Sequence, residues 1–100
     1  MVKLVVCYGA PQDEAAFDKH YADTHVGLVH KIPNLRRFEY GKVLATPDGS
    51  PAPYYYIAEL SFDNMEDFQA AMGSDEGRAA GDDVETFATG GATLMIAEAA

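Results

Sequence analysis

The sequence has 100 residues, 48% of them hydrophobic, and carries a formal net charge of −9. This length and apolar content predict one globular domain over residues 1–100 rather than a disordered chain. The negative charge argues against binding to nucleic acid or to an anionic membrane, because both select basic patches. Cys7 is the only cysteine, so no intramolecular disulfide can form and a reducing, cytoplasmic location is expected. The longest apolar run near the start, Leu4 to Tyr8, is too short for a signal core or a membrane span.

The first half of the chain predicts a strand, a long helix and a second strand. Val2 to Tyr8 is apolar and rich in β-branched residues over the length of a strand. Asp13 is a typical N-cap, and the predicted helix runs from there to about Lys31, before Pro33-Asn34 ends it. Leu35 to Ala45 then alternates charged and apolar residues, which predicts a long strand.

The next segment predicts a turn, a strand and a helix. Thr46 to Pro51 is dense in turn residues, and the aromatic run from Tyr54 to Phe62 predicts another long strand. Asp63 with Glu66 three residues later resembles a capping box, so a helix is expected to begin there. Phe68 occupies the centre of the apolar positions of that helix.

The last quarter of the chain is expected to contain a short helix, an irregular segment and a strand. Ser74 is the predicted cap of a helix that ends at about Ala80. Val84 and Phe87 are expected to anchor the irregular segment, and Thr93 to Ala97 is the last predicted strand.

The element order β-α-β-β-α-β predicts an α+β fold in which two crossover helices cover one face of an antiparallel sheet. The strand at residues 54–62 carries apolar side chains on both of its faces, with Tyr56, Ala58, Leu60 and Phe62 on one and Tyr55 and Ile57 on the other. Two helices cover only one face, so a second copy of the chain is expected to cover the other. This arrangement predicts a homodimer.

Aromatic and imidazole side chains recur at four-residue steps in the predicted long helix, at Phe17, Tyr21 and His25. At about 100° per residue these steps place the three side chains along one flank of the helix. The predicted buried stripe spans about 60° and consists of Phe17, Tyr21, Leu28 and Ile32. His25 lies about 50° from its centre, where a side chain can border a cavity. Because imidazole exchanges protons near neutral pH, His25 is the candidate general acid/base, with Tyr21 as its helper.

The other two histidines are expected to be exposed polar residues. His20 lies about 90° from the centre of the stripe on the opposite flank, and His30 points outward. A purely structural role remains the alternative for His25, as a half-buried histidine hydrogen bonded to the backbone.

The motif Phe17-x-x-x-Tyr21-x-x-x-His25 is followed by Val29 and by Ile32-Pro33-Asn34-Leu35. With the strand from Tyr54 to Phe62 and the Ser74-x-Glu76-Gly77 stretch, these motifs resemble the EthD family, named for ethyl tert-butyl ether degradation. The resemblance covers nearly the whole chain. It implies a ferredoxin-like βαββαβ protomer with a four-stranded sheet, assembled as a dimeric α+β barrel, and His25 matches the family's histidine. The wider superfamily includes isomerases, cyclases, cofactor-free monooxygenases and haem-handling proteins.

No metal or cofactor site is expected from the residue pattern. Successive histidines sit about 140° apart on the predicted helix, so they do not converge on one ion. A mononuclear metal site would need a carboxylate from elsewhere, for which Glu59 is the candidate. A haem site with His25 as the axial ligand is a further alternative.

Two classes of function remain. The first is a small cofactor-free enzyme of organic-compound catabolism or modification, similar to an isomerase, cyclase or monooxygenase. It would bind a small apolar organic molecule in a pocket bordered by His25 and Tyr21. The second is a non-catalytic accessory or ligand-binding protein of a degradation pathway, in which His25 only donates a hydrogen bond. A haem- or oxygen-linked oxidoreductase is the third alternative.

Overall fold

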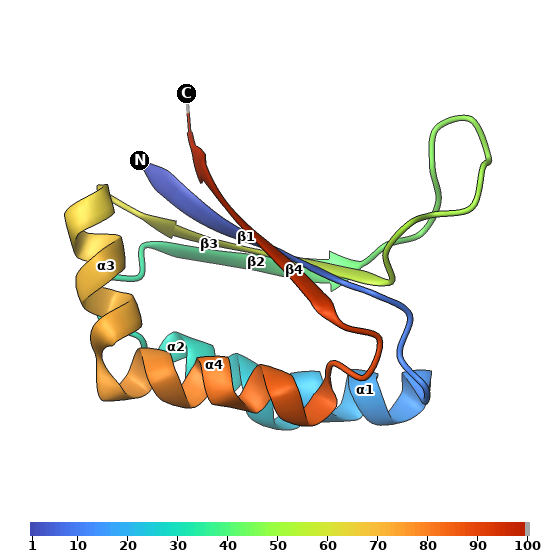
Figure 1. The fold of residues 1–100 in the computed structure, drawn as a ribbon, viewed down its shortest axis with the longest axis horizontal. Coiled ribbons are helices and arrows are strands. Elements are labelled where there is room, and N and C mark those ends of the chain that lie inside the picture. Colours follow the sequence, from blue (N-terminus) through green and yellow to red (C-terminus); the bar gives the residue numbers. More distant parts are fainter. Residues whose placement is uncertain (100) are drawn as a thin grey trace.

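The computed structural model describes residues 1–99, and one layer of it is a four-stranded antiparallel sheet. Its strands are β1 (Val2–Tyr8), β2 (Arg37–Lys42), β3 (Tyr56–Phe62) and β4 (Ala92–Glu98), in the spatial order β2-β3-β1-β4. β1 lies between β3 and β4 and pairs with both along its whole length. The helices lie on one side of this sheet (Figure 1), which confirms the predicted α+β, ferredoxin-like arrangement.

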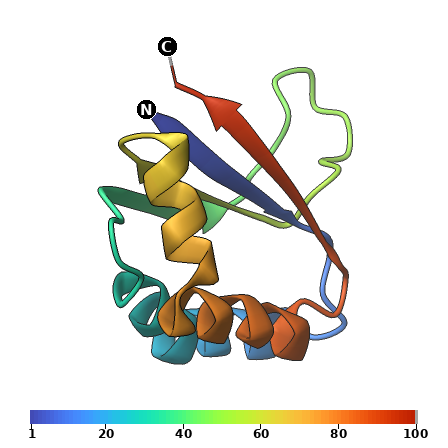
Figure 2. The same ribbon diagram turned by 60° about the vertical axis from the view of Figure 1, so that its left-hand side comes forward.

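The helical layer consists of one continuous rod and two further helices. The rod is built from α1 (Glu14–His20), a π-helical turn η1 (Tyr21–His25) and α2 (Val26–His30). The other two helices are α3 (Met65–Gly73) and α4 (Asp75–Phe87). α4 runs alongside the rod, and α3 is steeply inclined to both (Figures 1 and 2).

Two of the three predicted helix starts are confirmed. The carboxylate of Asp13 accepts a hydrogen bond from the Ala16 N–H at 3.1 Å, and Ser74 Oγ accepts one from the Gly77 N–H at 3.0 Å. The start of α3 lies one residue later than predicted, because Asn64 Oδ1 accepts from the Asp67 N–H at 2.8 Å. Asp63 is engaged elsewhere, in an ion pair with Arg36 at 2.8 Å.

α4 continues seven residues beyond the predicted end at Ala80, so the expectation of an irregular segment around Val84 and Phe87 is wrong. Ala80, Val84 and Phe87 recur at helical spacing and pack against the core. Burial of this stripe stabilises a stretch whose intrinsic helix propensity is weak, with Gly81-Asp82-Asp83 at its middle.

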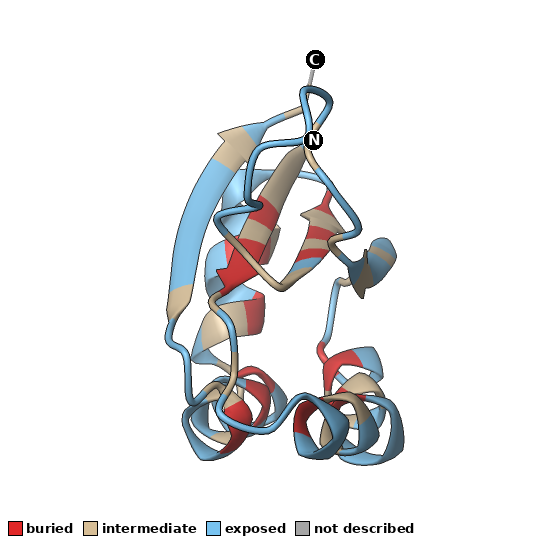
Figure 3. Cartoon of the chain, turned by 90° about the vertical axis from the view of Figure 1, so that its right-hand side faces the viewer, coloured by how far each residue is buried: buried red, intermediate tan, exposed pale blue. Residues whose placement is uncertain are grey.

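The core lies between the sheet and the helices (Figure 3). Of the two faces predicted for β3, the one that carries Ala58, Leu60 and Phe62 is the inner face, since these side chains are buried, and Phe68 of α3 packs edge-on against Phe62. The edge strand β4 is exposed along most of its length (Figure 3).

The outer face of the sheet is more mixed than predicted. It exposes apolar side chains, among them Ile57 and Met95, but an ion pair between Lys3 and Glu59 at 3.6 Å lies among them. Over residues 1–99, no helix combines the length and apolar character that crossing a membrane requires.

Candidate functional site

The rod changes pitch at Tyr21, where the candidate site begins. The Val26 N–H donates to the Tyr21 carbonyl, a hydrogen bond of the i→i+5 type. A turn of this type holds one more residue than an α turn, so side chains beyond it are displaced by one position around the rod. The buried position predicted at Leu28 is accordingly filled by Val29, which is 2% exposed, while Leu28 is only partly buried. The prediction of Leu28 at the centre of the stripe is therefore wrong.

Because of this displacement, His25 lies on the same side of the rod as His20, and both imidazoles contact the carboxylate of Asp83. His25 Nδ1 lies 2.9 Å from Asp83 Oδ2, and His20 Nε2 lies 2.8 Å from Asp83 Oδ1. The two histidines were predicted on opposite flanks of a regular helix, and His20 was expected to be exposed; the structure corrects both points. His25 is 4% exposed and contacts a side-chain carboxylate rather than the backbone. His30 is exposed, as predicted.

The Asp83 carboxylate determines which nitrogen of His25 carries the proton. An ionised carboxylate only accepts hydrogen bonds, so Nδ1 of His25 donates to it and the lone pair of the neutral ring lies on Nε2. Burial lowers the pKa of His25, although the neighbouring Asp83 acts in the opposite direction. Burial alone would raise the pKa of Asp83, but hydrogen bonds from His25 and His20 outweigh it and lower this pKa. At neutral pH the His25–Asp83 pair therefore consists of a neutral imidazole and an ionised carboxylate.

Tyr21 and Tyr8 bring two buried hydroxyls to the same region. Each of these tyrosines is 1% exposed, and the rings of Tyr21 and His25 lie 5.0 Å apart. Burial raises the pKa of Tyr8 to about 12, and burial with the neighbouring Tyr8 and Tyr56 raises the pKa of Tyr21 further. Both phenols are thus protonated donors at neutral pH. The two hydroxyls are neighbours, but within residues 1–99 no group meets the Tyr21 hydroxyl with the geometry of a full hydrogen bond.

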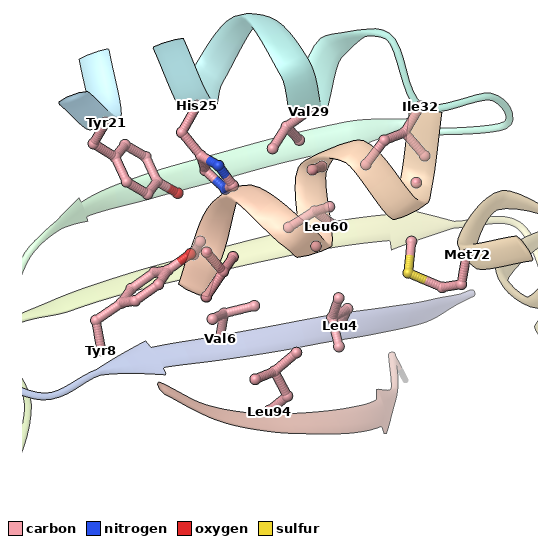
Figure 4. A pocket seen from close by; sticks show the side chains of 15 residues that line it. Leu4, Val6, Tyr8, Tyr21, His25, Val29, Ile32, Leu60, Met72 and Leu94 are labelled. Atoms are coloured by element: carbon pink, nitrogen blue, oxygen red, sulfur yellow. The ribbon is translucent and has the colours of Figure 1, made fainter. Parts of the chain in front are cut away.

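These side chains line a cavity of about 90 Å³ between the rod, α4 and the inner face of the sheet (Figure 4). Tyr21 and His25 project into it from the rod, and Tyr8 projects into it from β1. The other lining residues are apolar or glycine: Leu4, Val6, Val29, Ile32, Ala58, Leu60, Met72, Gly77, Ala80, Gly81, Val84 and Leu94. At roughly 10–15 Å³ for each water on such a measure, the space suits several waters; a cavity of roughly 150 Å³ holds a benzene ring, so a ring here would require a shift of the lining side chains.

The metal alternative that uses Glu59 is not supported by the geometry. Glu59 lies on the outer face of the sheet, opposite to the inner face that borders His25, and pairs with Lys3. Among residues 1–99, no group of three or more His, Cys, Asp or Glu side chains is arranged to hold a metal ion. The cavity of about 90 Å³ leaves little room for a haem macrocycle beside His25.

Asp83 and Tyr8 belong to this site but are not among the residues predicted from the sequence. The segment that carries Asp83 is predicted to be irregular, so nothing indicates the face on which it lies. The helical spacing of Ala80, Val84 and Phe87 could have indicated that this segment is a helix. In such a helix Asp83 lies one turn before Phe87, on the flank that faces the rod. Tyr8 is the last residue of β1, and its register was the available signal: Leu4, Val6 and Tyr8 share the inner face of the sheet.

Comparison with solved structures places the fold among small α+β proteins. A dimeric ferredoxin-like protein of unknown function from Thermobifida fusca superimposes with a TM-score of 0.75 at 14% identity, covering 98% of this chain and 90% of that chain. SnoaB, a cofactor-independent oxygenase from Streptomyces nogalater, superimposes with a TM-score of 0.68 at 15% identity, covering 98% and 91%. At these identities the likeness shows a shared fold.

Two relatives are much more similar. An uncharacterized 11.0 kDa protein from the thcB–thcC intergenic region of Rhodococcus erythropolis is 40% identical over 98 residues, which is 98% of this chain and 94% of that protein. The crystal structure of an ethyl tert-butyl ether degradation (EthD) family protein from Bacillus halodurans superimposes with a TM-score of 0.93 at 42% identity, covering 100% and 99%. The family model for the EthD domain matches residues 10–91. The chain therefore belongs to the EthD family.

Proposed function

We propose that this protein is a small cofactor-free enzyme that transfers protons on an apolar organic molecule carrying one carbonyl or phenol oxygen. The observation that carries the proposal is the Tyr21 hydroxyl, buried beside His25 in a largely apolar cavity: the Tyr8 hydroxyl is its polar neighbour, but no group of residues 1–99 forms a well-aligned hydrogen bond with it. A buried donor left unpaired costs free energy, typically about 1–3 kcal/mol. A ligand oxygen at that position would satisfy it.

The chemistry of a carbonyl ligand follows from these groups. Tyr21 donates a hydrogen bond to the carbonyl oxygen, and His25 Nε2 removes a proton from the adjacent carbon. The electron pair of the broken C–H bond forms a C=C bond while the π pair of the carbonyl moves to the oxygen, where the hydrogen bond from Tyr21 stabilises the resulting enolate. Asp83 stabilises the imidazolium that forms, because its carboxylate accepts from Nδ1. The imidazolium then returns a proton to the same carbon and the carbonyl re-forms, so that atoms and charge balance.

Hydrogen–deuterium exchange of a simple ketone tests this proposal directly. The protein and cyclohexanone are mixed in D₂O, and loss of the protons next to the carbonyl is followed by ¹H NMR. We expect the wild type to accelerate exchange over buffer and His25→Ala to reduce the rate by about 10²–10⁴-fold. His30→Ala is the matched control and should retain the full rate, since His30 is exposed and outside the cavity.

The contrasting outcome supports a non-catalytic accessory protein. In that case the wild type binds the ketone, His25→Ala weakens binding by about tenfold through one lost hydrogen bond, and exchange never exceeds the buffer rate. The circular dichroism spectrum of His25→Ala must match that of the wild type, because only a folded variant distinguishes the two outcomes. We further propose a role in the degradation of organic compounds, which the name of the EthD family supports, and a cytoplasmic location, which the presence of a single cysteine supports.

The proposal includes a homodimer formed through the outer face of the sheet. Ile57 and Met95 of that face are 38% and 48% exposed, and the helices cover only the inner face. The related Thermobifida protein is described as dimeric, which supports the same assembly here. A stable interface of this kind typically buries about 1,600 Å² in total.

A further inference from the structure

We propose that the ligand enters the cavity through the groove between α4 and β4, and that a substituent of the bound ligand stays in this groove. Gly81 is the residue that keeps the passage from the groove to the cavity open. This inference rests on the proposed function, because it takes the ring and its oxygen to sit beside Tyr21 and His25. It adds the shape of the ligand: a small ring with an apolar chain on the side opposite the oxygen.

A groove of about 400 Å³ runs between α4 and β4 and adjoins the cavity. The two spaces share Gly81, Val84 and Leu94 as lining residues. Beyond them the groove is walled by small side chains, Ala88, Gly91 and Ala92, with Glu85 as its one charged residue within the described part of the chain. Such a lining suits an unbranched apolar chain.

The exposure of the inner face of the sheet shows where the helical layer stops. Leu4 and Val6 of β1 are 8% and 5% exposed, whereas their direct partners on β4, Ile96 and Leu94, are 50% and 55% exposed. These four side chains point to the same face, so the helices cover β1 but leave β4 uncovered (Figure 3). Leu94 lies across the cavity from Tyr21 (Figure 4), so a chain leaving past Leu94 extends away from the hydroxyl.

Gly81 provides the passage on the helical side. A Cβ placed at this position would meet no atom within 4 Å, so a larger side chain would extend into open space rather than into the packed core. Glycine in a helix interior costs about 1 kcal/mol relative to alanine, so Gly81 lowers the stability of α4 where it borders the cavity. A leucine at 81 should therefore fold and narrow the passage.

The test uses phenol, 4-ethylphenol and 4-butylphenol as probes of wild type, Gly81→Leu and Gly27→Leu. Affinities are measured by isothermal titration, and ¹H–¹³C NMR of the histidine and tyrosine rings locates the bound phenol. Gly27 is the matched control: it is exposed on α2, its Cβ would also meet nothing within 4 Å, and it lies outside both spaces.

In the wild type and in Gly27→Leu, affinity should rise by up to about fourfold for each methylene buried in the groove. In Gly81→Leu, the gain from the alkyl chain should disappear when each alkylphenol is compared with phenol on the same variant. A full alkyl gain in Gly81→Leu would overturn the route, as would the absence of any gain in the wild type. Loss of phenol binding itself in Gly81→Leu would show that a side chain at this position fills the space of the ring rather than the groove, and would overturn the assignment of Gly81 to the passage. If phenol does not perturb His25 or Tyr21 of the wild type, the proposed function fails and the route fails with it.

Discussion

At the scale of single residues, one carboxylate determines the properties of the site. Asp83 accepts hydrogen bonds from His25 and His20, and it fixes the tautomer in which Nε2 of His25 bears the lone pair. The same ring is buried, which disfavours its charged form and lowers its pKa. These two effects together make His25 a neutral base at pH 7.

Replacing Asp83 with Asn should lower the pKa of His25 further, because the carboxylate that favours the imidazolium is removed. The folded protein already binds this proton less readily than the unfolded chain does. The free energy of unfolding should therefore decrease as the pH falls below about 6.5, and the decrease should be larger in Asp83→Asn. NMR titration of the imidazole protons and urea denaturation at several pH values measure the two effects.

Asp82→Asn is the matched control, because Asp82 is the exposed neighbour of Asp83 and forms no hydrogen bond with either histidine in the described structure. It should leave the His25 titration unchanged. A wild-type His25 that titrates at or above pH 6.5 would contradict the assignment of a neutral base.

At the scale of secondary-structure elements, the π turn at Tyr21–His25 determines which side chains of the rod face α4 and the sheet. Turns of this type are rare and occur frequently at functional sites. Here the extra residue lets Tyr21, His25 and His20 all face the side of the rod that meets α4 and the sheet. The second half of α4 completes the site, because it carries Asp83. This part of α4 is helical because Val84 and Phe87 pack against the core.

The π turn predicts that Val29 matters more for stability than the larger Leu28. Val29→Ala removes two fully buried methyl groups and should cost about 2–3 kcal/mol. Leu28→Ala affects a partly buried side chain and should cost about 1 kcal/mol. Urea denaturation of both variants tests this order, and a larger loss in Leu28→Ala would indicate a regular α-helix through this segment in solution.

At the scale of the whole molecule, the helical layer covers one face of the sheet and leaves the other open. Ile57 lies in β3 beside Cys7 of β1 and Gly41 of β2, at the middle of the open face. The Lys3–Glu59 ion pair on that face indicates that a dimer interface there would include polar contacts as well as apolar ones.

Ile57→Glu should weaken the homodimer by at least about tenfold, because burying an unpaired carboxylate at an interface is costly. Met65→Glu is the matched control: Met65 is 41% exposed, but it lies at the start of α3 in the helical layer. Size-exclusion chromatography with light scattering at micromolar concentration measures the effect. A monomeric wild type, or a dimer unaffected by Ile57→Glu, would contradict the proposed assembly.

Local signals in the sequence determined the element order, the class of fold and which side chains of β3 share a face. Alternation of apolar residues, turn residues and the caps at Asp13 and Ser74 act over a few neighbours, so they can be recognised without a structure. The spacing of Phe17, Tyr21 and His25 also indicated the side of the rod on which the candidate site lies.

Only the tertiary structure decided the register beyond Tyr21, the length of α4 and the partner of His25. A π turn has no local sequence signal of its own, and here it accompanies the fit of the rod against the sheet and α4. The segment from Gly81 to Phe87 is helical because Val84 and Phe87 gain burial against residues far away in the chain. Asp83 lies 58 residues from His25, so their contact depends on how α4 packs against the rod, which no local pattern encodes.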